Sequence, residues 1–204
     1  MDREKQNRIF VSLARSDSSL RSLIKRYAPL EFYDKKPHPP FHTLVSMIIN
    51  QQLSQKAANT IQNRLLVRQG GRYFSARKLS TIQDLRQYGL SQQKQKYVHG
   101  LIQSTISGRL NFTKLRKQAN EDVRDQLMSL PGIGAWTADV FLLANFHRED
   151  VFPAGDLILQ KFMQGHFSLP LNSKPADYAK FAQRWQPHRS LVSLLFWKAA
   201  NTSL

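Results

Sequence analysis

The residues best suited to chemistry in this chain are a glycine-containing turn at residues 130–134 and an aspartate that follows it. Gly132 and Gly134 flank one apolar residue, a spacing that favours a tight turn between two helices. Bare N–H groups at the start of the second helix, together with the positive end of its dipole, suit a phosphate oxygen. Because this binding needs no side chain, the loop can hold a nucleic-acid backbone of any sequence. The simpler interpretation is an ordinary turn between helices.

Asp156 lies 22 residues after Gly134 and directly before an apolar stretch, Leu157 to Leu159. The simpler role for an aspartate at a helix start is to cap the helix. A carboxylate fixed beside apolar residues also stabilises developing positive charge, such as that of the oxocarbenium-like transition state in glycosidic cleavage. We therefore keep two hypotheses for Asp156, a helix cap and a catalytic carboxylate.

Tryptophan residues offer a stacking surface for a base extruded from a duplex. Trp136 directly follows the glycine turn, and Trp197 lies near the end of the chain. A cationic base would gain further from the faces of these rings. Burial in the core is the alternative for both residues, and Trp185 is expected to be a core residue.

A third candidate is the segment from Asn50 to Ser54, in which three amide side chains precede Leu53. The segment ends an apolar helix, so a polar helix terminus is the simpler interpretation. The functional interpretation is a wedge that fills the gap left in a duplex when a nucleotide is flipped out.

The chain is strongly basic: its 204 residues include 30 lysines and arginines but 14 aspartates and glutamates, a formal net charge of +16. This charge favours a polyanionic partner such as nucleic acid. A membrane surface is the competing partner, but we find no clear basic amphipathic helix, lipidation signal or membrane-spanning apolar run. The N-terminus lacks the apolar core of a secretory signal, so we expect a cytoplasmic, nucleoid-associated protein in a prokaryote or a nuclear one in a eukaryote.

The chain contains no cysteine, which limits the chemistry open to it. Disulfides, cysteine nucleophiles, thiolate zinc sites and cysteine-ligated iron–sulfur clusters are all excluded. The six histidines show no metal-ligand spacing. We therefore expect no catalytic metal and no other catalytic cofactor.

Helical periodicity runs through the sequence and strand signals are few and unpaired, so we predict an all-α fold. Ser54, Ser80 and Ser91 are predicted to cap the helices that follow them, and Gly70 with Gly71 is predicted to end a helix. The expected helices, with an irregular connector at residues 29–40, span residues 3–15, 18–27, 41–50, 55–68, a short segment after Ser80, 92–107, 123–130, 135–145, 155–166, 174–183 and 189–202.

These elements are expected to form one domain, residues 1–204, with two lobes. One lobe combines both chain ends, about residues 1–40 and 155–204, and the other comprises about residues 41–154 with the glycine turn. Because Asp156 begins a helix at the lobe boundary, we expect it to face a cleft between the lobes.

Five segments, taken together and in this order, resemble the helix-hairpin-helix (HhH-GPD) superfamily of base-excision DNA glycosylases, and within it the 3-methyladenine, or alkylpurine, branch. The resemblance runs from about Phe41 to Trp197. It implies a two-lobed all-α fold, a monomer, and damaged double-stranded DNA lying across the cleft. The segments are Ile48 to Ala58, Gly89 to Lys94, Leu130 to Ala138, Gly155 with Asp156, and Trp185 to Ser190 followed by Trp197.

The resemblance also implies roles for the candidate residues. Asp156 would be the catalytic carboxylate, and Trp136 and Trp197 would line the base pocket. Gln52 or Leu53 would be the wedge. The remaining implied contacts are Ser54 near the minor groove, the backbone of Gly132, Ile133, Gly134, Ala135 and Thr137 at a DNA phosphate, and the hairpin backbone of Leu130 and Ile133 at a structural Na⁺ or K⁺.

Two departures from the family pattern narrow the activity. Bifunctional relatives carry a lysine nucleophile two residues after the second hairpin glycine, where this chain has Trp136. Because tryptophan forms no Schiff base, a monofunctional enzyme without strong strand cleavage is expected. Some relatives hold a four-cysteine iron–sulfur cluster, which this chain cannot, and some have an extra N-terminal domain for which it leaves little room.

The expected reaction is hydrolysis of the N-glycosidic bond of a flipped-out damaged nucleotide. Purines alkylated at N3 or N7, such as 3-methyladenine and 7-methylguanine, are cationic and leave with little acid catalysis, so one carboxylate can suffice. Two alternatives stay open: a glycosylase for deaminated bases such as hypoxanthine or uracil, and a helix-hairpin-helix DNA-binding module without catalysis. An excision assay separates them.

Overall fold

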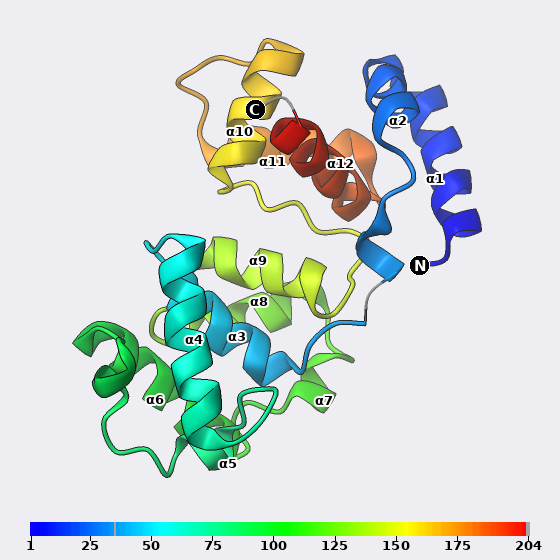
Figure 1. The fold of residues 1–204 in the computed structure, drawn as a ribbon. Helices are drawn as coiled ribbons and strands as arrows, with labels where there is room; N and C mark the ends of the chain where they lie inside the picture. The colour runs from blue at the N-terminus through cyan, green and yellow to red at the C-terminus, as the bar shows by residue number, and fades with distance from the viewer. Residues whose placement is uncertain (35, 203–204) are drawn as a thin grey trace. The chain divides into compact units, whose positions relative to one another are not determined.

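The computed structural model describes residues 1–34 and 36–202, and every regular element in that part of the chain is a helix (Figure 1). The all-α prediction is therefore confirmed. The chain forms two compact units, which we name the terminal unit (residues 1–36 and 147–204) and the central unit (residues 37–146). Each unit has a hydrophobic core of its own.

The central unit contains the helices that carry both candidate turns. Its apolar helix α3 is surrounded by neighbours, because α4, α6 and α9 all pack against it. Leu44, Val45, Ile48 and Ile49 of α3 are completely buried. The elements are α3 (Pro40–Asn50), α4 (Gln55–Gln69), α5 (Ala76–Leu79), η3 (Leu85–Tyr88), α6 (Gln92–Ile106), α7 (Phe112–Leu115), α8 (Asn120–Met128) and α9 (Ala135–Ala144).

Capping agrees with the prediction at two of the three serines. Ser54 and Ser91 each accept a backbone N–H three residues ahead, at 3.3 and 3.2 Å, and so cap α4 and α6. The predicted N-terminal cap at Ser80 is wrong. Its hydroxyl donates backward to the Arg77 carbonyl (2.8 Å), so the residue closes α5, and Asp84 caps the short helix η3 instead.

The terminal unit is organised around α12, most of whose side chains are buried. The Trp185 ring is completely buried and lies among aromatic neighbours that include Phe152, Phe167 and Phe196. This burial confirms the prediction that Trp185 is a core residue. The elements are α1 (Arg3–Ser16), η1 (Ser18–Leu20), α2 (Arg21–Tyr27), η2 (Glu31–Asp34), α10 (Leu157–Phe167), α11 (Pro175–Ala182), η4 (Gln183–Trp185) and α12 (Arg189–Thr202).

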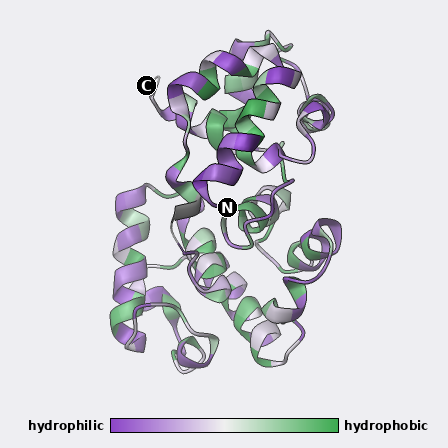
Figure 2. Ribbon diagram, turned by 90° about the vertical axis from the view of Figure 1, so that its right-hand side faces the viewer, coloured by the Kyte–Doolittle hydropathy of each residue, from purple (hydrophilic) through white to green (hydrophobic). Residues whose placement is uncertain are grey.

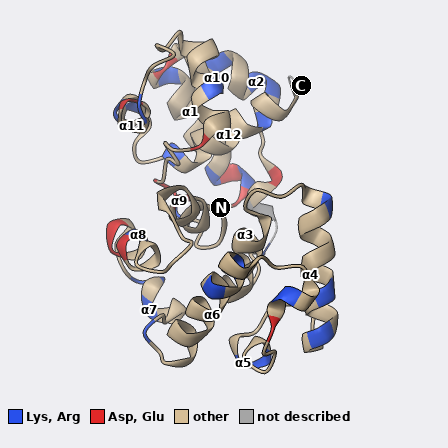
Figure 3. Cartoon of the chain, turned by 90° about the vertical axis from the view of Figure 1, so that its left-hand side faces the viewer, with Lys and Arg blue, Asp and Glu red and all other residues tan. Residues whose placement is uncertain are grey.

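Most outer helices of both units combine hydrophobic and hydrophilic residues around their turns (Figure 2). Across the described residues, no helix has both the length and the apolarity that crossing a membrane requires. Lysines and arginines are spread over several helices of each unit (Figure 3). The net charge of +16 is thus distributed rather than confined to one segment.

Candidate functional site

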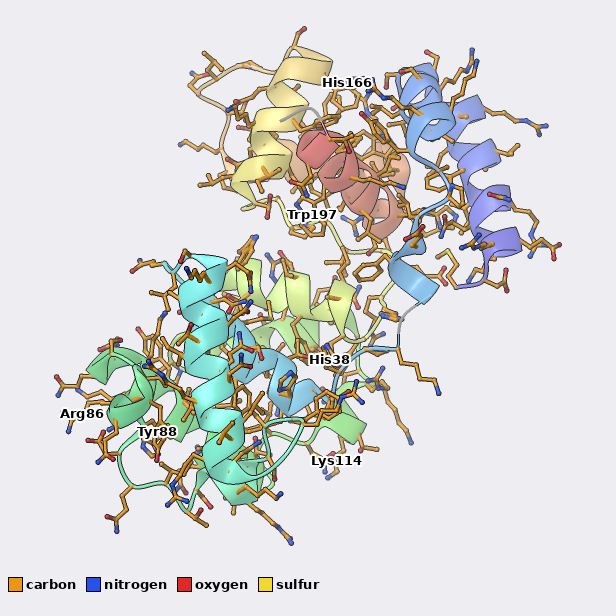
Figure 4. The ribbon with its side chains drawn as sticks, viewed as in Figure 1. His38, Arg86, Tyr88, Lys114, His166 and Trp197 are labelled. Carbon is orange, nitrogen blue, oxygen red and sulfur yellow. The ribbon has the colours of Figure 1, made fainter. Side chains whose placement is uncertain are left out.

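The Asp156 carboxylate is held by two donors within the terminal unit. Its side chain is buried, with 7% exposure, and Oδ1 accepts the backbone N–H of Leu159 (2.9 Å), the bond of a helix cap on α10. The same oxygen accepts the indole Nε1–H of Trp197 (3.1 Å). Trp197 belongs to α12 and is labelled in Figure 4. The capping hypothesis is therefore correct in geometry, and the second donor fixes the orientation of the carboxylate beyond what a cap requires.

The loop before Asp156 is tied to the start of α12. Ser190 is completely buried, and its hydroxyl lies 2.9 Å from the Val151 nitrogen and 3.2 Å from the Val151 oxygen. Arg189 forms a two-pronged ion pair with Asp150, at 2.6 and 2.9 Å. The sequence showed Arg189 and Ser190 as part of a motif without giving them a role. In the structure, both residues hold the loop that directly precedes Asp156.

Apolar side chains flank the carboxylate on its own helix. Leu159 is completely buried, whereas Leu157 and Ile158 are exposed on the first turn of α10. The apolar stretch expected after Asp156 is therefore only partly core. Exposed leucine and isoleucine beside a buried carboxylate form an apolar border, which suits contact with a flat, weakly solvated group such as a nucleobase.

In the central unit, the glycine turn joins α8 to α9 as a hairpin. Gly132 has φ +85°, and a Cβ added there would lie 2.3 Å from the Tyr97 ring, so this position requires glycine. Gly134 directly precedes α9 and provides no side-chain cap, and its Cβ position is open. Arg124 pairs with buried Asp139 (3.1 Å) and ties the two helices together. The first turn of α9 therefore presents backbone N–H groups that no side chain caps.

The residues whose backbone is predicted to hold a phosphate differ in the exposure of their side chains. Ile133 and Thr137 are buried, so only their backbone groups are suited to a phosphate. The Leu130 carbonyl accepts the Ile133 N–H (3.2 Å), and a carbonyl oxygen has a second lone pair that fits a Na⁺ or K⁺ ion. No cluster of three or more carboxylate or imidazole ligands suited to a metal exists among the described residues. The monovalent cation at this hairpin stays a prediction.

The amide turn, residues 51–54, connects α3 to α4 and is conformationally strained. Gln52 has φ +55°, a left-handed conformation that costs a non-glycine residue about 1 kcal/mol. Both wedge candidates, Gln52 and Leu53, are exposed, while the Ser54 hydroxyl is engaged as the cap of α4. Strain of this kind persists where surrounding contacts enforce it, and it is common at ligand contacts.

Two side chains enforce the conformation of the amide turn. The Lys94 ammonium, from the first turn of α6, donates to the carbonyls of Ile49 (2.7 Å) and Gln51 (2.5 Å). Burial lowers the pKa of Lys94. The Gln51 side-chain amide donates to the Gly132 carbonyl (2.9 Å), which links the amide turn to the hairpin. Sequence reasoning missed both roles, although each residue lies in a motif that it quoted.

A cavity of about 780 Å³ opens beside these turns within the central unit. Trp136 and Gln52 both line it, together with Met47, Tyr97 and Val140. Trp136 is 42% exposed, so the alternative of a core tryptophan is wrong for this residue. The structure thus brings Trp136 together with Gln52 in one unit, and Asp156 together with Trp197 in the other.

Residues 45–187 match the family model described as HhH-GPD superfamily base excision DNA repair protein. Over 215 aligned residues the chain is 26% identical to DNA-3-methyladenine glycosylase 1 of Schizosaccharomyces pombe, covering 98% of this chain and 93% of that protein. The crystal structure of a DNA-3-methyladenine glycosidase from Bacillus halodurans superposes with a TM-score of 0.85 at 32% identity, covering 96% and 90% of the two chains. The Schizosaccharomyces pombe 3-methyladenine DNA glycosylase in complex with abasic DNA superposes with a TM-score of 0.81 at 25% identity, covering 95% and 97%.

Proposed function

The chain belongs to the HhH-GPD superfamily of base excision DNA repair proteins, in its 3-methyladenine glycosylase branch, and from this premise we propose that it excises alkylated purines from double-stranded DNA. It is a DNA glycosylase, an enzyme that hydrolyses an N-glycosidic bond. We propose 3-methyladenine and 7-methylguanine as substrates, because these cationic bases leave readily and the relatives named above are 3-methyladenine enzymes.

The buried carboxylate of Asp156, held by the Trp197 indole, is the observation that carries the proposed mechanism. When the bond between C1′ and the base breaks, its electron pair leaves with the cationic base, which becomes neutral. Positive charge then develops on the sugar, and a fixed anion stabilises it without reorganising. A water molecule oriented by Asp156 bonds through its oxygen to C1′ and passes one proton to the Asp156 carboxylate, which then releases that proton to solvent.

The absence of a lysine from the hairpin helix supports a hydrolytic enzyme without lyase activity. Trp136 occupies the position of the nucleophilic lysine in bifunctional relatives, and its indole forms no Schiff base. The exposed Trp136 ring in the cavity offers instead a face on which a cationic base stacks. Trp197, which hydrogen-bonds Asp156, is proposed as the second aromatic contact.

DNA binding is proposed to rest on the central unit's two turns. The N–H groups of Gly132 and of the uncapped start of α9, residues 134–137, hold a phosphate, and Gln52 or Leu53 enters the duplex where the nucleotide has left. Ser54, at the start of α4, lies near the minor groove. Because phosphate contacts release counterions, affinity should fall steeply as salt rises.

The test is base release from defined DNA. Purified protein is incubated with methylated DNA and with matched duplexes that hold one uracil or one hypoxanthine, and free base and abasic sites are measured. We expect release of 3-methyladenine and 7-methylguanine, about 1,000-fold slower in Asp156→Asn, since removing a transition-state electrostatic contact costs roughly 4 kcal/mol. Asparagine keeps an oxygen for the Leu159 and Trp197 donors, so the fold should survive.

Other outcomes would replace the proposal. Release of hypoxanthine or uracil without alkylpurines would make the protein a glycosylase for deaminated bases. Tight DNA binding without release of any base would make it a binding module, and Asp156 would then be a helix cap alone. Undiminished excision by Asp156→Asn would remove this residue from the mechanism.

A further inference from the structure

To act as a wedge, the amide turn needs contacts from other parts of the central unit that keep its conformation fixed. Its Gln52 holds a left-handed conformation, and the side chains at 52 and 53 are exposed. A turn that enters a base stack must keep its shape against the bases that it displaces. Within the turn, the Leu53 N–H donates to the Asn50 carbonyl (3.2 Å), but the turn has neither a glycine at the left-handed position nor a proline, so local sequence supplies only part of that rigidity.

Lys94 supplies such contacts from a different helix. Its ammonium donates to two carbonyls at the C-terminal end of α3, those of Ile49 (2.7 Å) and Gln51 (2.5 Å). Those carbonyls carry the partial negative charge of a helix C-terminus, so a cation is favoured there. Because the Gln51 carbonyl directly precedes Gln52, the lysine restrains the peptide on which the left-handed residue depends.

The same helix also contacts the hairpin. Tyr97, one turn after Lys94 on α6, packs so closely on Gly132 that a Cβ there would lie 2.3 Å from its ring. The Gln51 side-chain amide connects the amide turn directly to the hairpin by donating to the Gly132 carbonyl (2.9 Å). The amide turn, the hairpin and the start of α6 are thus connected by three independent contacts.

We propose that Lys94 is a positioning residue that makes the amide turn and the hairpin act as one rigid body. The hairpin binds the phosphate backbone of the damaged strand, and the amide turn enters the base stack at a fixed distance from the bound phosphate. Without the ammonium, the amide turn would lose its fixed conformation, and the rate of nucleotide flipping would fall more for paired DNA than for unpaired DNA. This inference rests on the proposed function, because it assigns Lys94 to the flipping step of that reaction.

The test compares paired with unpaired DNA. Single-turnover excision of the same alkylated base is measured in a full duplex and in the isolated strand, where no partner has to be displaced. We expect Lys94→Met to slow excision from the duplex about tenfold and from the single strand less than twofold. Lys94→Arg, which keeps a donor cation, should restore most of the duplex rate.

Lys96→Met is the matched control, because it removes the same charge from an exposed position two residues along α6. It should leave the ratio between duplex and single-strand rates unchanged. Equal losses on both substrates in Lys94→Met, or an unchanged duplex rate, would overturn the proposal. If Lys94→Met does not fold, Gln51→Ala, which removes the hydrogen bond to the Gly132 carbonyl, should lower the same ratio, and no change in it would overturn the proposal.

A second readout separates this inference from the proposed activity. A duplex with 2-aminopurine opposite a tetrahydrofuran abasic analogue reports wedge insertion by fluorescence, and it needs no catalysis. At saturating protein, Lys94→Met should give less than about half of the wild-type fluorescence change, while Lys96→Met gives all of it. If the wild-type protein excises no base, the proposed function fails, and this signal alone decides the role of Lys94. Equal signals for all variants would overturn that role.

Discussion

Asp156 and Gln52 are both proposed to act on the same nucleotide, yet they are held in contrasting ways. Asp156 is buried, and its carboxylate accepts hydrogen bonds from the Leu159 backbone and the Trp197 indole, while Ser190 and Arg189 hold the preceding loop. Gln52 is exposed, and its turn is held by bonds to backbone carbonyls. The contacts around Asp156 fix the position of its negative charge, whereas the contacts around Gln52 fix the backbone conformation of the amide turn.

This difference predicts which substitutions affect which property. Around Asp156, removing a side-chain contact should change the reaction rate more than it changes DNA affinity. Around the amide turn and the hairpin, changes to the backbone should alter folding and DNA binding first.

The largest effect on folding stability is expected at Gly132. Gly132→Ala should lower the free energy of unfolding by about 3 kcal/mol, because the added carbon meets the Tyr97 ring at 2.3 Å and φ is +85°. Gly134→Ala is the matched control, with open space around its Cβ and an ordinary φ of −96°, and should cost less than about 1 kcal/mol. Urea denaturation measures both, and equal losses would show that the close approach at Gly132 is not limiting.

Ser190→Ala should lower the free energy of unfolding by about 2 kcal/mol and also slow excision. The change leaves the Val151 N–H buried without its acceptor and loosens the loop before Asp156. Ser193→Ala, one turn along α12, is the control, because that hydroxyl only donates back to the Arg189 carbonyl of its own helix (2.9 Å). Urea denaturation and single-turnover excision should separate the two variants. A slowed reaction in Ser193→Ala as well would argue against a specific role for the Ser190 contact.

As the pH falls, the folding stability of the central unit should decrease before that of the terminal unit. Burial, with a smaller contribution from His38, lowers the pKa of His42 to about 4, from an ordinary value of 6.5. Below pH 6.5 the unfolded chain binds a proton that the native state excludes, so the free energy of unfolding decreases from pH 6.5 down to about 4 and changes no further below that. We expect a loss of about 1.5 kcal/mol, allowing for solvent screening.

Hydrogen exchange across this pH range checks the prediction. Amides of α3 should lose protection as the pH falls, and His42→Gln, which keeps an acceptor for the Phe74 N–H, should remove the pH dependence. In the terminal unit, the pKa of Asp17 is lowered by hydrogen bonds from Ser19 and Trp185 that outweigh its burial. That carboxylate loses its stabilising effect only below about pH 4, its ordinary range. Loss of protection in α12 before α3 would contradict the assignment.

The smallest effect is expected from Trp197→Phe. Phenylalanine keeps an aromatic face but loses the indole N–H that orients Asp156, so the excision rate constant should fall about tenfold, near 1.4 kcal/mol, with DNA affinity unchanged. Single-turnover kinetics and binding titrations measure the two quantities. A matching loss of affinity would mean that Trp197 acts through stacking rather than through the carboxylate.

Much of the fold was predictable from the sequence, because the signals are local. Apolar residues at helical spacing located α3, and the serine caps located the starts of α4 and α6. Helix ends were less predictable: α8 begins at Asn120 rather than at residue 123, and Ser80 bonds backward instead of forward. Ser80 has backbone partners available on either side, whereas α8 follows Ala119, which provides no side-chain cap, so no polar residue marks its start.

The residues of the candidate site were predictable from the sequence, but the contacts that hold those residues in place were not. Asp156, Trp136, Trp197 and the glycine turn were all named from sequence. The sequence left open whether Trp136 is buried or exposed, and the structure shows that it is 42% exposed. Burial depends on which distant segments pack around a side chain, and one sequence without its fold does not contain that information.

The sequence by itself determined the all-α class, the basic charge, the absence of cysteine chemistry and the order of the motifs that place the chain in its family. These follow from residue types and short spacings. Only the tertiary structure showed that Lys94 reaches the Gln51 carbonyl, 43 residues away, and that Trp197 reaches Asp156, 41 residues away. Such bonds require separate helices to converge within hydrogen-bond distance, and their geometry is set by core packing rather than by any local pattern.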